Sequence, residues 1–191
     1  MLYVLFFLVT FAAVVAVGTK KRLAQRAEEP SKEMNAMLEL REGVLSRTFF
    51  ANAAPLAADT PRCVLMDWNM SGNGVATLLA FYDGTTSLYF SSGGGILGAG
   101  AHEPVERAAT RFRQHAVAER ARFRPATSFA LPEARIVVLY LVTDTETLSS
   151  GPIPTSEFEK GTHPLTALGA SAQAVITAVR QVSSTPGQGA A

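Results

Sequence analysis

The first 18 residues form an uninterrupted apolar run, which constrains the chain more than any other feature. Residues 1–18 read MLYVLFFLVTFAAVVAVG and contain no charged side chain. A helix that rises about 1.5 Å per residue would span about 27 Å here, close to the thickness of the hydrocarbon core of a bilayer. We therefore expect a single transmembrane anchor over residues 1–19, with the lipid bilayer as its partner.

Basic residues directly after the run set the expected orientation. They are Lys20, Lys21, Arg22 and Arg26. Positive residues next to a span favour the cytoplasmic side, so we predict a signal anchor with the body of the chain in the cytoplasm. Two alternatives stay open. Residues 16–18 (Ala-Val-Gly) are a small-x-small site at which a signal peptide would be cleaved and the body exported. The run would otherwise lie along the membrane interface.

Composition excludes several classes of protein. The chain has 191 residues, of which 48% are hydrophobic and 17% charged, so it differs from intrinsically disordered chains. Its single Cys excludes an internal disulfide framework. A formal net charge of +1 provides little electrostatic attraction to nucleic acid, and we expect no nucleic-acid partner.

Polar, Pro-rich and Gly-rich stretches divide the rest of the chain. We expect a basic and polar juxtamembrane linker over residues 20–30, an amphipathic helix over 31–47 and a second linker over 48–61. A folded domain over 62–182 and a disordered tail over 183–191 complete the organisation.

Turn chemistry and apolar runs predict the elements of the folded domain. Strands are expected over 63–69, 75–82 and 85–91, joined by turns at Asn73-Gly74 and Asp83-Gly84. A helix over 103–123, strands over 135–143 and 145–150, and a helix over 162–182 follow. Strands joined by tight turns pair antiparallel.

With the helix over 31–47, the element order is α-βββ-α-ββ-α. This order predicts an α+β domain in which helices flank a five-stranded antiparallel sheet. It is similar to the order in profilin-like domains, including the roadblock and longin types. The similarity concerns topology alone and carries no function.

A glycine-rich stretch, residues 93–100, lies between the third strand and the next helix. Gly93, Gly95 and Gly98 formally match the G-x-G-x-x-G pattern of dinucleotide-binding turns. The strand before them belongs to a meander rather than a βαβ unit, and Glu103 at the helix start would repel phosphate. We expect a structural loop that lets the strand pass close to the helix. In the alternative interpretation, Gly93, Gly94, Gly95 and Gly98 bind a small ligand.

The helix expected over 103–123 is rich in arginine. Candidates for a surface that contacts anionic lipid head groups or an acidic partner protein are Arg107, Arg111, Arg120 and Arg122. The simpler interpretation is a solvated helix face, on which Arg107 pairs with Glu103 one turn earlier.

Two histidines stand just before expected helices. His102 precedes Glu103-Pro104, and His163 precedes Pro164. Local capping of the helices is the simpler interpretation, and the alternative is a shared ligand site if both helices begin at the same sheet edge. Zinc requires three or four ligands, and no spacing here supplies them, so we predict no metal and no cofactor.

Two features of the first strand are interpreted structurally. Cys63 is expected to be a small buried hydrophobic residue rather than a reactive thiol. In the triplet Asp67-Trp68-Asn69, we expect Trp68 to anchor the core and Asp67 to support the following turn through backbone hydrogen bonds.

The sequence contains no recognisable catalytic motif. The leading hypothesis is a membrane-anchored, non-enzymatic interaction or scaffold domain that binds a protein partner or self-associates. The alternative is a small-ligand sensing domain that uses the loop Gly93–Gly100. An enzyme with an unrecognised site is the third hypothesis.

Overall fold

A computed structural model describes residues 32–57, 60–70 and 74–184. The anchor over 1–19, the linker over 20–30 and residues 185–191 of the expected tail lie outside the described residues. Among the helices of the described residues, none combines the length and the apolar character needed to cross a membrane. The described residues from Lys32 onwards form one compact unit.

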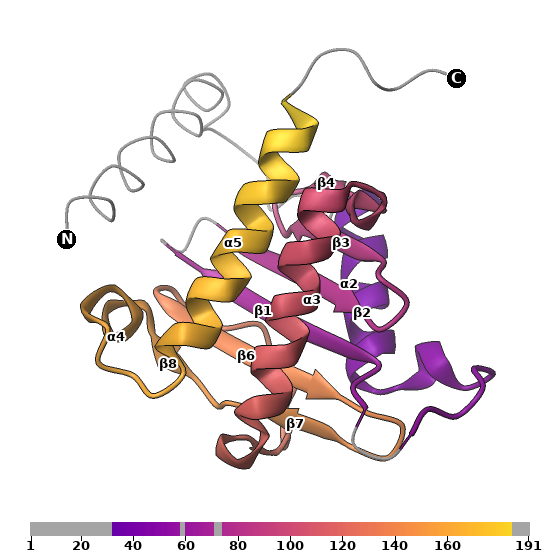
Figure 1. Cartoon of the computed structure of the whole chain (residues 1–191), viewed down its shortest axis with the longest axis horizontal. Helices are drawn as coiled ribbons and strands as arrows, with labels where there is room; N and C mark the ends of the chain where they lie inside the picture. The colour runs from indigo at the N-terminus through magenta and orange to yellow at the C-terminus, as the bar shows by residue number, and fades with distance from the viewer. Residues whose placement is uncertain (1–31, 58–59, 71–73, 185–191) are drawn as a thin grey trace. The chain divides into compact units, whose positions relative to one another are not determined.

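The unit is an α+β domain built on one antiparallel sheet (Figure 1). Its helices are α2 (Lys32–Leu45), α3 (Glu103–Ala118), α4 (Thr155–Lys160) and α5 (Thr166–Ser183). Short 3-10 turns are η1 (Thr48–Phe50), η2 (Ala99–Ala101) and η3 (Arg120–Arg122). Its five longer strands, of three to seven residues, are β1 (Cys63–Asn69), β2 (Val75–Phe81), β3 (Thr86–Phe90), β6 (Ile136–Val142) and β7 (Thr147–Ser149). The remaining strands are β4 (Gly95–Ile96), β5 (Arg124–Pro125) and β8 (Ile153–Pro154).

The sheet has eight strands, so the prediction of five was wrong. The strand order is β4-β3-β2-β1-β6-β7-β5, and β8 pairs with β6. The five predicted strands are the five long ones, while β4, β5 and β8 contain two residues each. Two residues cannot display an alternating apolar pattern, so nothing in the sequence marks such short ladders.

Strand β1 is the centre of the sheet. It pairs antiparallel with β2 on one side and with β6 on the other, along its whole length in both cases. Successive side chains of a strand point to opposite faces. Val64, Met66 and Trp68 accordingly face one helical layer, and Cys63 and Leu65 face the other.

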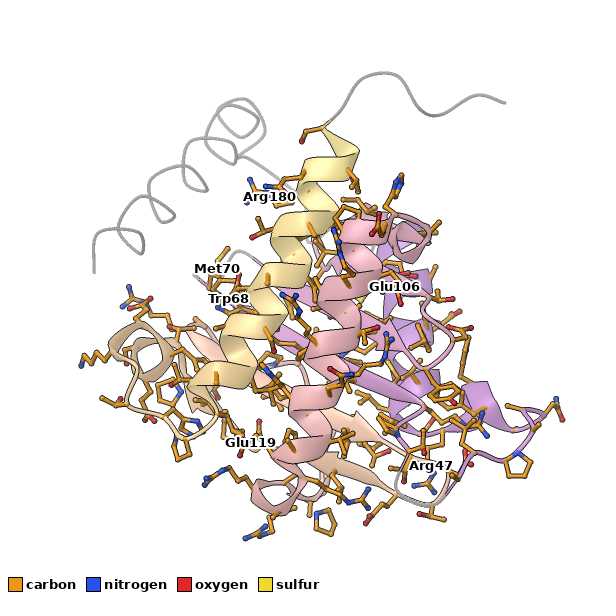
Figure 2. The ribbon with its side chains drawn as sticks, viewed as in Figure 1. Arg47, Trp68, Met70, Glu106, Glu119 and Arg180 are labelled. Carbon is orange, nitrogen blue, oxygen red and sulfur yellow. The ribbon has the colours of Figure 1, made fainter. Side chains whose placement is uncertain are left out.

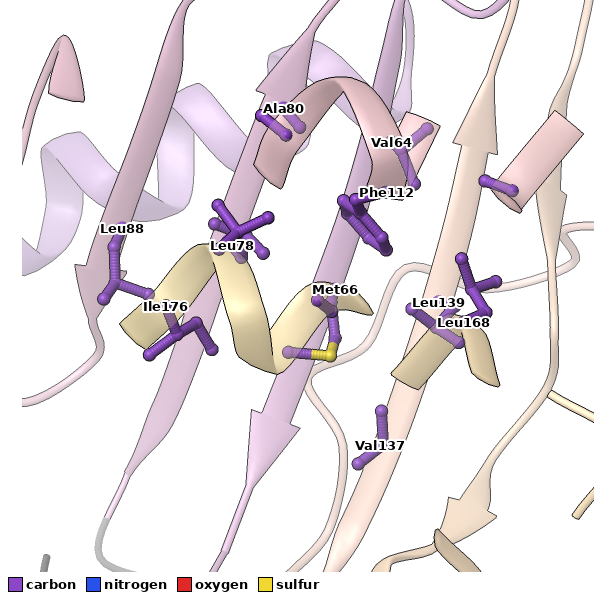
Figure 3. Packing of buried hydrophobic residues seen from close by; sticks show 14 of the residues in the cluster. Val64, Met66, Leu78, Ala80, Leu88, Phe112, Val137, Leu139, Leu168 and Ile176 are labelled. Atoms are coloured by element: carbon purple, nitrogen blue, oxygen red, sulfur yellow. The ribbon is translucent and has the colours of Figure 1, made fainter. Parts of the chain in front are cut away.

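The larger core lies between the sheet and the helices α3 and α5, which pack side by side on one face (Figure 1). Figure 3 shows Phe112 of α3 and Leu168 and Ile176 of α5 directed at the sheet residues Met66 and Leu78. The two helices run in opposite directions, with Glu106 near one end of α3 and Glu119 near the other, while Arg180 marks the last turns of α5 (Figure 2).

Helix α2 covers the opposite face of the sheet. Val44 and Leu45 are fully buried against Leu65, Leu79 and the other inward side chains of that face. Thr147 of β7 donates a hydrogen bond to the backbone oxygen of Leu45 at 2.7 Å. The last turn of α2 is therefore fixed to the sheet by both apolar packing and a buried hydrogen bond.

Two helix boundaries differ from expectation. The helix predicted over 103–123 ends at Ala118 and continues as η3, and the helix predicted over 162–182 begins at Thr166 after the separate helix α4. Gly161 ends α4 with a positive φ of 68°. Such a left-handed residue is a common helix terminator, but α4 has only six residues, too few to show a clear helical period in the sequence.

Candidate functional site

The first half of the glycine-rich stretch forms a tight connection between β3 and β4. Gly93 and Gly94 have φ values of 98° and 80°, and Phe90 donates its backbone N–H to the Gly94 oxygen at 3.1 Å. A Cβ on Gly95 would lie 2.7 Å from the backbone oxygen of Leu88. These glycines are explained by the backbone path that they make possible.

The second half of the stretch crosses the turn between β2 and β3. Gly98 has a φ of 64° at the start of η2, and its N–H lies 3.4 Å from the Ser87 hydroxyl. Gly100 sits directly on the backbone of Gly84, so that an added Cβ would lie 2.0 Å from the Gly84 oxygen. This contact packs η2 against the β2–β3 turn. Helix α3, which begins two residues after η2, therefore starts beside that turn.

The crossing leaves an open cleft of about 410 Å³ beside α3, which we call the α3 cleft. Its walls are Tyr82, Asp83, Gly84 and Thr85 from the β2–β3 turn, Gly98, Gly100 and Ala101 from the segment before α3, and Glu106 and Arg113 from α3. Figure 2 shows Glu106 on the flank of α3 away from α5. Of the predicted ligand-binding residues, only Gly98 lines this cleft.

Helix α3 presents a polar stripe to the cleft. Thr110 donates its hydroxyl hydrogen to Glu106 Oε1 at 3.3 Å and accepts a hydrogen bond from Arg113 Nη2 at 2.8 Å. The Nη1 of Arg113 is shielded from solvent and has no hydrogen-bond partner among the described residues. Spacings of four and three residues place these side chains on one helix face.

Partial burial changes the electrostatics of Arg113. Desolvation lowers the pKa of its guanidinium, and the nearby carboxylates of Glu106 and Asp83 act in the opposite direction. An arginine keeps its proton in proteins, so the group remains a cation whose hydration is incomplete. No carboxylate forms an ion pair with Arg113 within the part of the chain that the structure describes.

The two histidines are not brought together. His163 Nδ1 accepts the Leu165 N–H at 3.1 Å, a local hydrogen bond just before α5, whose first turn has no side-chain cap, so the predicted capping role was wrong. His102 is exposed at the start of α3, and its side chain makes no capping hydrogen bond. Because α3 and α5 are antiparallel, their first residues lie at opposite ends of the helical layer (Figure 1). Across residues 32–57, 60–70 and 74–184, no cluster of three or more His, Cys, Asp or Glu residues is arranged to hold a metal ion.

The four arginines proposed as a membrane or partner surface differ in their surroundings. Arg107 pairs with Glu103 at 3.2 Å, as the spacing predicts, and both side chains are largely exposed. Arg122 pairs with Glu119 within the same region. Arg120 instead reaches the loop between β6 and β7, where it binds Glu146 at 2.5 Å. Arg111 is exposed, and its side chain has no ion pair or hydrogen bond among the described residues.

The interpretation of Asp67 as a turn-supporting residue was wrong. Its side chain is fully buried beneath α2 and accepts hydrogen bonds from Arg41 and from Thr77. Trp68 packs against the larger core as predicted, although its side chain is only partly buried. The alternation of side chains along β1 explains why neighbours in sequence serve different layers.

Cys63 is a buried residue, as its sequence context predicts. Its side chain is inaccessible to solvent, and burial raises the pKa of the thiol far above its usual range. The neutral thiol packs in the smaller core beneath α2. This environment is typical of a structural cysteine.

Sequence reasoning missed the central residue of the α3 cleft. Arg113 is not among the four arginines of this helix that the sequence singled out as candidates, and nothing distinguished it from the solvated face. The signal that would have separated it is the spacing of Glu106, Thr110 and Arg113, which places three polar side chains on one stripe next to the buried Phe112.

Neither a protein-family model, nor a curated protein, nor a solved structure matches the chain.

Proposed function

We propose that the chain is a single-pass membrane protein whose folded domain is a non-enzymatic binding domain on the cytoplasmic side. The α3 cleft holds a small polar ligand, which the domain senses. Support for the ligand comes from one observation: Arg113 Nη1 is shielded from solvent and lacks a partner among the described residues. An unsatisfied buried donor costs about 1–3 kcal/mol, and a ligand that accepts its hydrogen bond would recover part of that free energy.

The walls of the cleft suit close contact with a ligand. Gly84 and Gly98 present backbone without side chains, and the space beside each Cα is open, so a bound molecule can approach the main chain. The hydroxyl of Thr110 is held between Glu106 and Arg113 by hydrogen bonds. The cleft therefore offers fixed polar contacts on one wall and main chain on the other, an arrangement suited to recognition.

The test is a thermal-shift screen of the full chain in detergent against a library of small metabolites. A ligand at about ten times its Kd adds roughly 1.4 kcal/mol of stability, which raises the unfolding temperature. We expect at least one compound to do so, and Arg113→Gln to abolish its effect. Arg111→Gln is the matched control, because Arg111 is exposed on the same helix without partners among the described residues. Retention of the shift in Arg113→Gln would place the ligand elsewhere.

A second candidate function is self-association as a scaffold, and a specific aromatic contact favours it. The ring of Phe49 is 56% exposed, yet its centroid lies 5.2 Å from that of Phe50 and 5.6 Å from that of Phe81. Phe81 itself is buried, so the exposed ring stands on a fixed support. Supported aromatic rings dominate many protein interfaces, and a shared membrane raises the local concentration of copies.

Self-association is tested by crosslinking the full chain in membranes. We expect Phe49→Ser to reduce the crosslinked dimer. Leu97→Ser is the matched control, because Leu97 is an apolar residue that is even more exposed, at 68%, on a different part of the domain. Equal loss in both variants, or a wild-type chain without dimer, would exclude the Phe49 surface as the site of self-association.

A further inference from the structure

Three charged groups share the α3 cleft, and their pattern restricts the chemistry of a ligand. Arg113 supplies one positive charge, while Asp83 and Glu106 supply two negative charges. The three groups are close enough to interact electrostatically, yet neither carboxylate forms an ion pair with Arg113 in the described part of the chain. The cleft is thus divided between one cationic and two anionic positions.

Each carboxylate is only partly used by the protein. Asp83 Oδ1 accepts the Thr85 N–H at 2.9 Å, and Glu106 Oε1 accepts the Thr110 hydroxyl. Among the described residues, no hydrogen bond engages Asp83 Oδ2 or Glu106 Oε2. Both side chains are exposed at the rim of the cleft. Acceptors for a donor group therefore stand beside a guanidinium that requires an acceptor.

We infer that the ligand of the α3 cleft is a small zwitterion, with a carboxylate that binds Arg113 and an ammonium group that binds Asp83 and Glu106. This inference rests on the proposed function, which it deepens by naming the ligand class. Guanidinium–carboxylate and ammonium–carboxylate contacts are charge-assisted hydrogen bonds, the strong class among hydrogen bonds.

Ligands with a single charge fit this pattern less well. An anion alone is attracted by Arg113 but repelled by two carboxylates. A cation alone gains the two carboxylates but leaves Arg113 Nη1 without an acceptor and brings like charge towards the guanidinium. Only a molecule with both groups satisfies all three side chains at once. Because the cleft is open to solvent, screening limits the strength of each contact.

Three probes with the same four-carbon chain test the inference: 4-aminobutyrate as the zwitterion, butyrate as the anion and butylammonium as the cation. Binding to the full chain in detergent micelles is followed by NMR at the backbone N–H groups of Gly98 and Gly100. We expect 4-aminobutyrate to bind at least about tenfold more tightly than either singly charged probe, a difference of about 1.4 kcal/mol.

Variants assign the two ends of the zwitterion. Arg113→Gln should remove binding of 4-aminobutyrate, whereas Arg111→Gln should not. The double variant Asp83→Asn and Glu106→Gln keeps the acceptor oxygens that Thr85 and Thr110 use, and it should remove the advantage of 4-aminobutyrate over butyrate. This double variant also keeps the test decisive if Arg113→Gln does not fold.

The outcomes separate this inference from the proposed function. If butyrate binds as tightly as 4-aminobutyrate, the cleft is an anion site, so the ligand class is wrong while the binding function stands. If none of the three probes shifts the Gly98 and Gly100 signals, the zwitterion is excluded. The metabolite screen with Arg113→Gln then decides whether the cleft binds any ligand.

Discussion

Arg41 and Asp67 form a buried ion pair that joins helix α2 to the central strand of the sheet. Arg41 donates from Nε and Nη2 to the same oxygen, Asp67 Oδ2, at 2.9 and 2.6 Å. Asp67 Oδ1 accepts the Thr77 hydroxyl at 2.6 Å. Arg41 Nη1 also donates to the backbone oxygen of Phe129 at 2.7 Å. One arginine therefore links three segments: helix α2, strand β1 and the loop before β6.

Breaking this pair should strongly destabilise the domain. Asp67→Ala leaves the Arg41 guanidinium buried beneath α2 without its carboxylate, and removing one partner of a buried pair costs roughly 3–5 kcal/mol. The measurement is urea denaturation of the full chain, followed by the fluorescence of its single tryptophan, Trp68. The double variant Arg41→Met and Asp67→Ala should lose less stability than the sum of the two single variants, because no lone charge remains. Additive losses would show that the two side chains are not coupled.

Gly100 and Gly43 should respond in opposite directions to alanine. At Gly100 the added Cβ would lie 2.0 Å from the Gly84 oxygen, so the backbone must move, and overpacking typically costs about 1–3 kcal/mol. At Gly43, within α2, the nearest atom would lie at an ordinary 3.7 Å, and alanine favours the helix by about 0.5–1 kcal/mol. Thermal unfolding of both variants gives the comparison. An unchanged unfolding temperature for Gly100→Ala would contradict the close crossing of η2 and the β2–β3 turn.

The thiol of Cys63 should be almost unreactive in the folded protein. Burial both excludes reagents and raises the pKa of the thiol, and the reactive species is the thiolate. We expect labelling with a disulfide reagent to be slow in buffer and fast in urea, with a rate in buffer that follows the opening of the fold. Variants that destabilise the domain, such as Asp67→Ala, should speed up labelling in buffer. Rapid labelling of the native chain would show that β1 is accessible.

Acid should weaken the contact between Arg62 and Asp144. A side-chain hydrogen bond from Arg62, followed by the Leu56 backbone N–H at 2.7 Å, lowers the pKa of Asp144 below its usual 3.8. A carboxylate whose pKa is lowered on folding stabilises the fold above the unfolded-state pKa, and this contribution disappears as the pH falls through the folded-state pKa.

Asp144→Asn should therefore lower the unfolding temperature at neutral pH, and its difference from wild type should shrink as the pH drops below 3.8. Unfolding temperatures measured across that range provide the check. Glu133→Gln serves as the control, because Glu133 is exposed and its side chain forms no ion pair in the described residues. A difference that stays constant with pH would mean that Asp144 acts through packing rather than charge.

Local chemistry made the long strands predictable from the sequence. The Asp83-Gly84 turn and the apolar run of β6 mark their elements without any knowledge of distant residues, and β1 begins and ends where the sequence indicated. The strands β4, β5 and β8 and the helix α4 were missed, because two residues show no alternation and the six residues of α4 are too few to show a clear helical period.

The candidate site was less predictable for a related reason. Composition and spacing drew attention to the glycines, but Gly93, Gly94 and Gly95 shape a connection rather than the α3 cleft. What separates Arg113 from Arg111 is not residue type but the side of α3 on which each lies. The same holds for Asp67, whose partner Arg41 is 26 residues away, on the helix expected over 31–47 and outside the bounds expected for the folded domain.

The position of β1 at the centre of the sheet also sets an order of folding. The pairing of β1 with β2, and of β2 with β3, joins neighbouring segments, whereas the other partner of β1, strand β6, lies about 70 residues further along the chain. Local contacts form faster than those that must close a long loop. During synthesis, the meander β1–β3 can assemble first. The other edge of β1 then stays unpaired until β6 has left the ribosome. That open edge is the point at which a newly made chain is most exposed to pairing with a neighbouring copy.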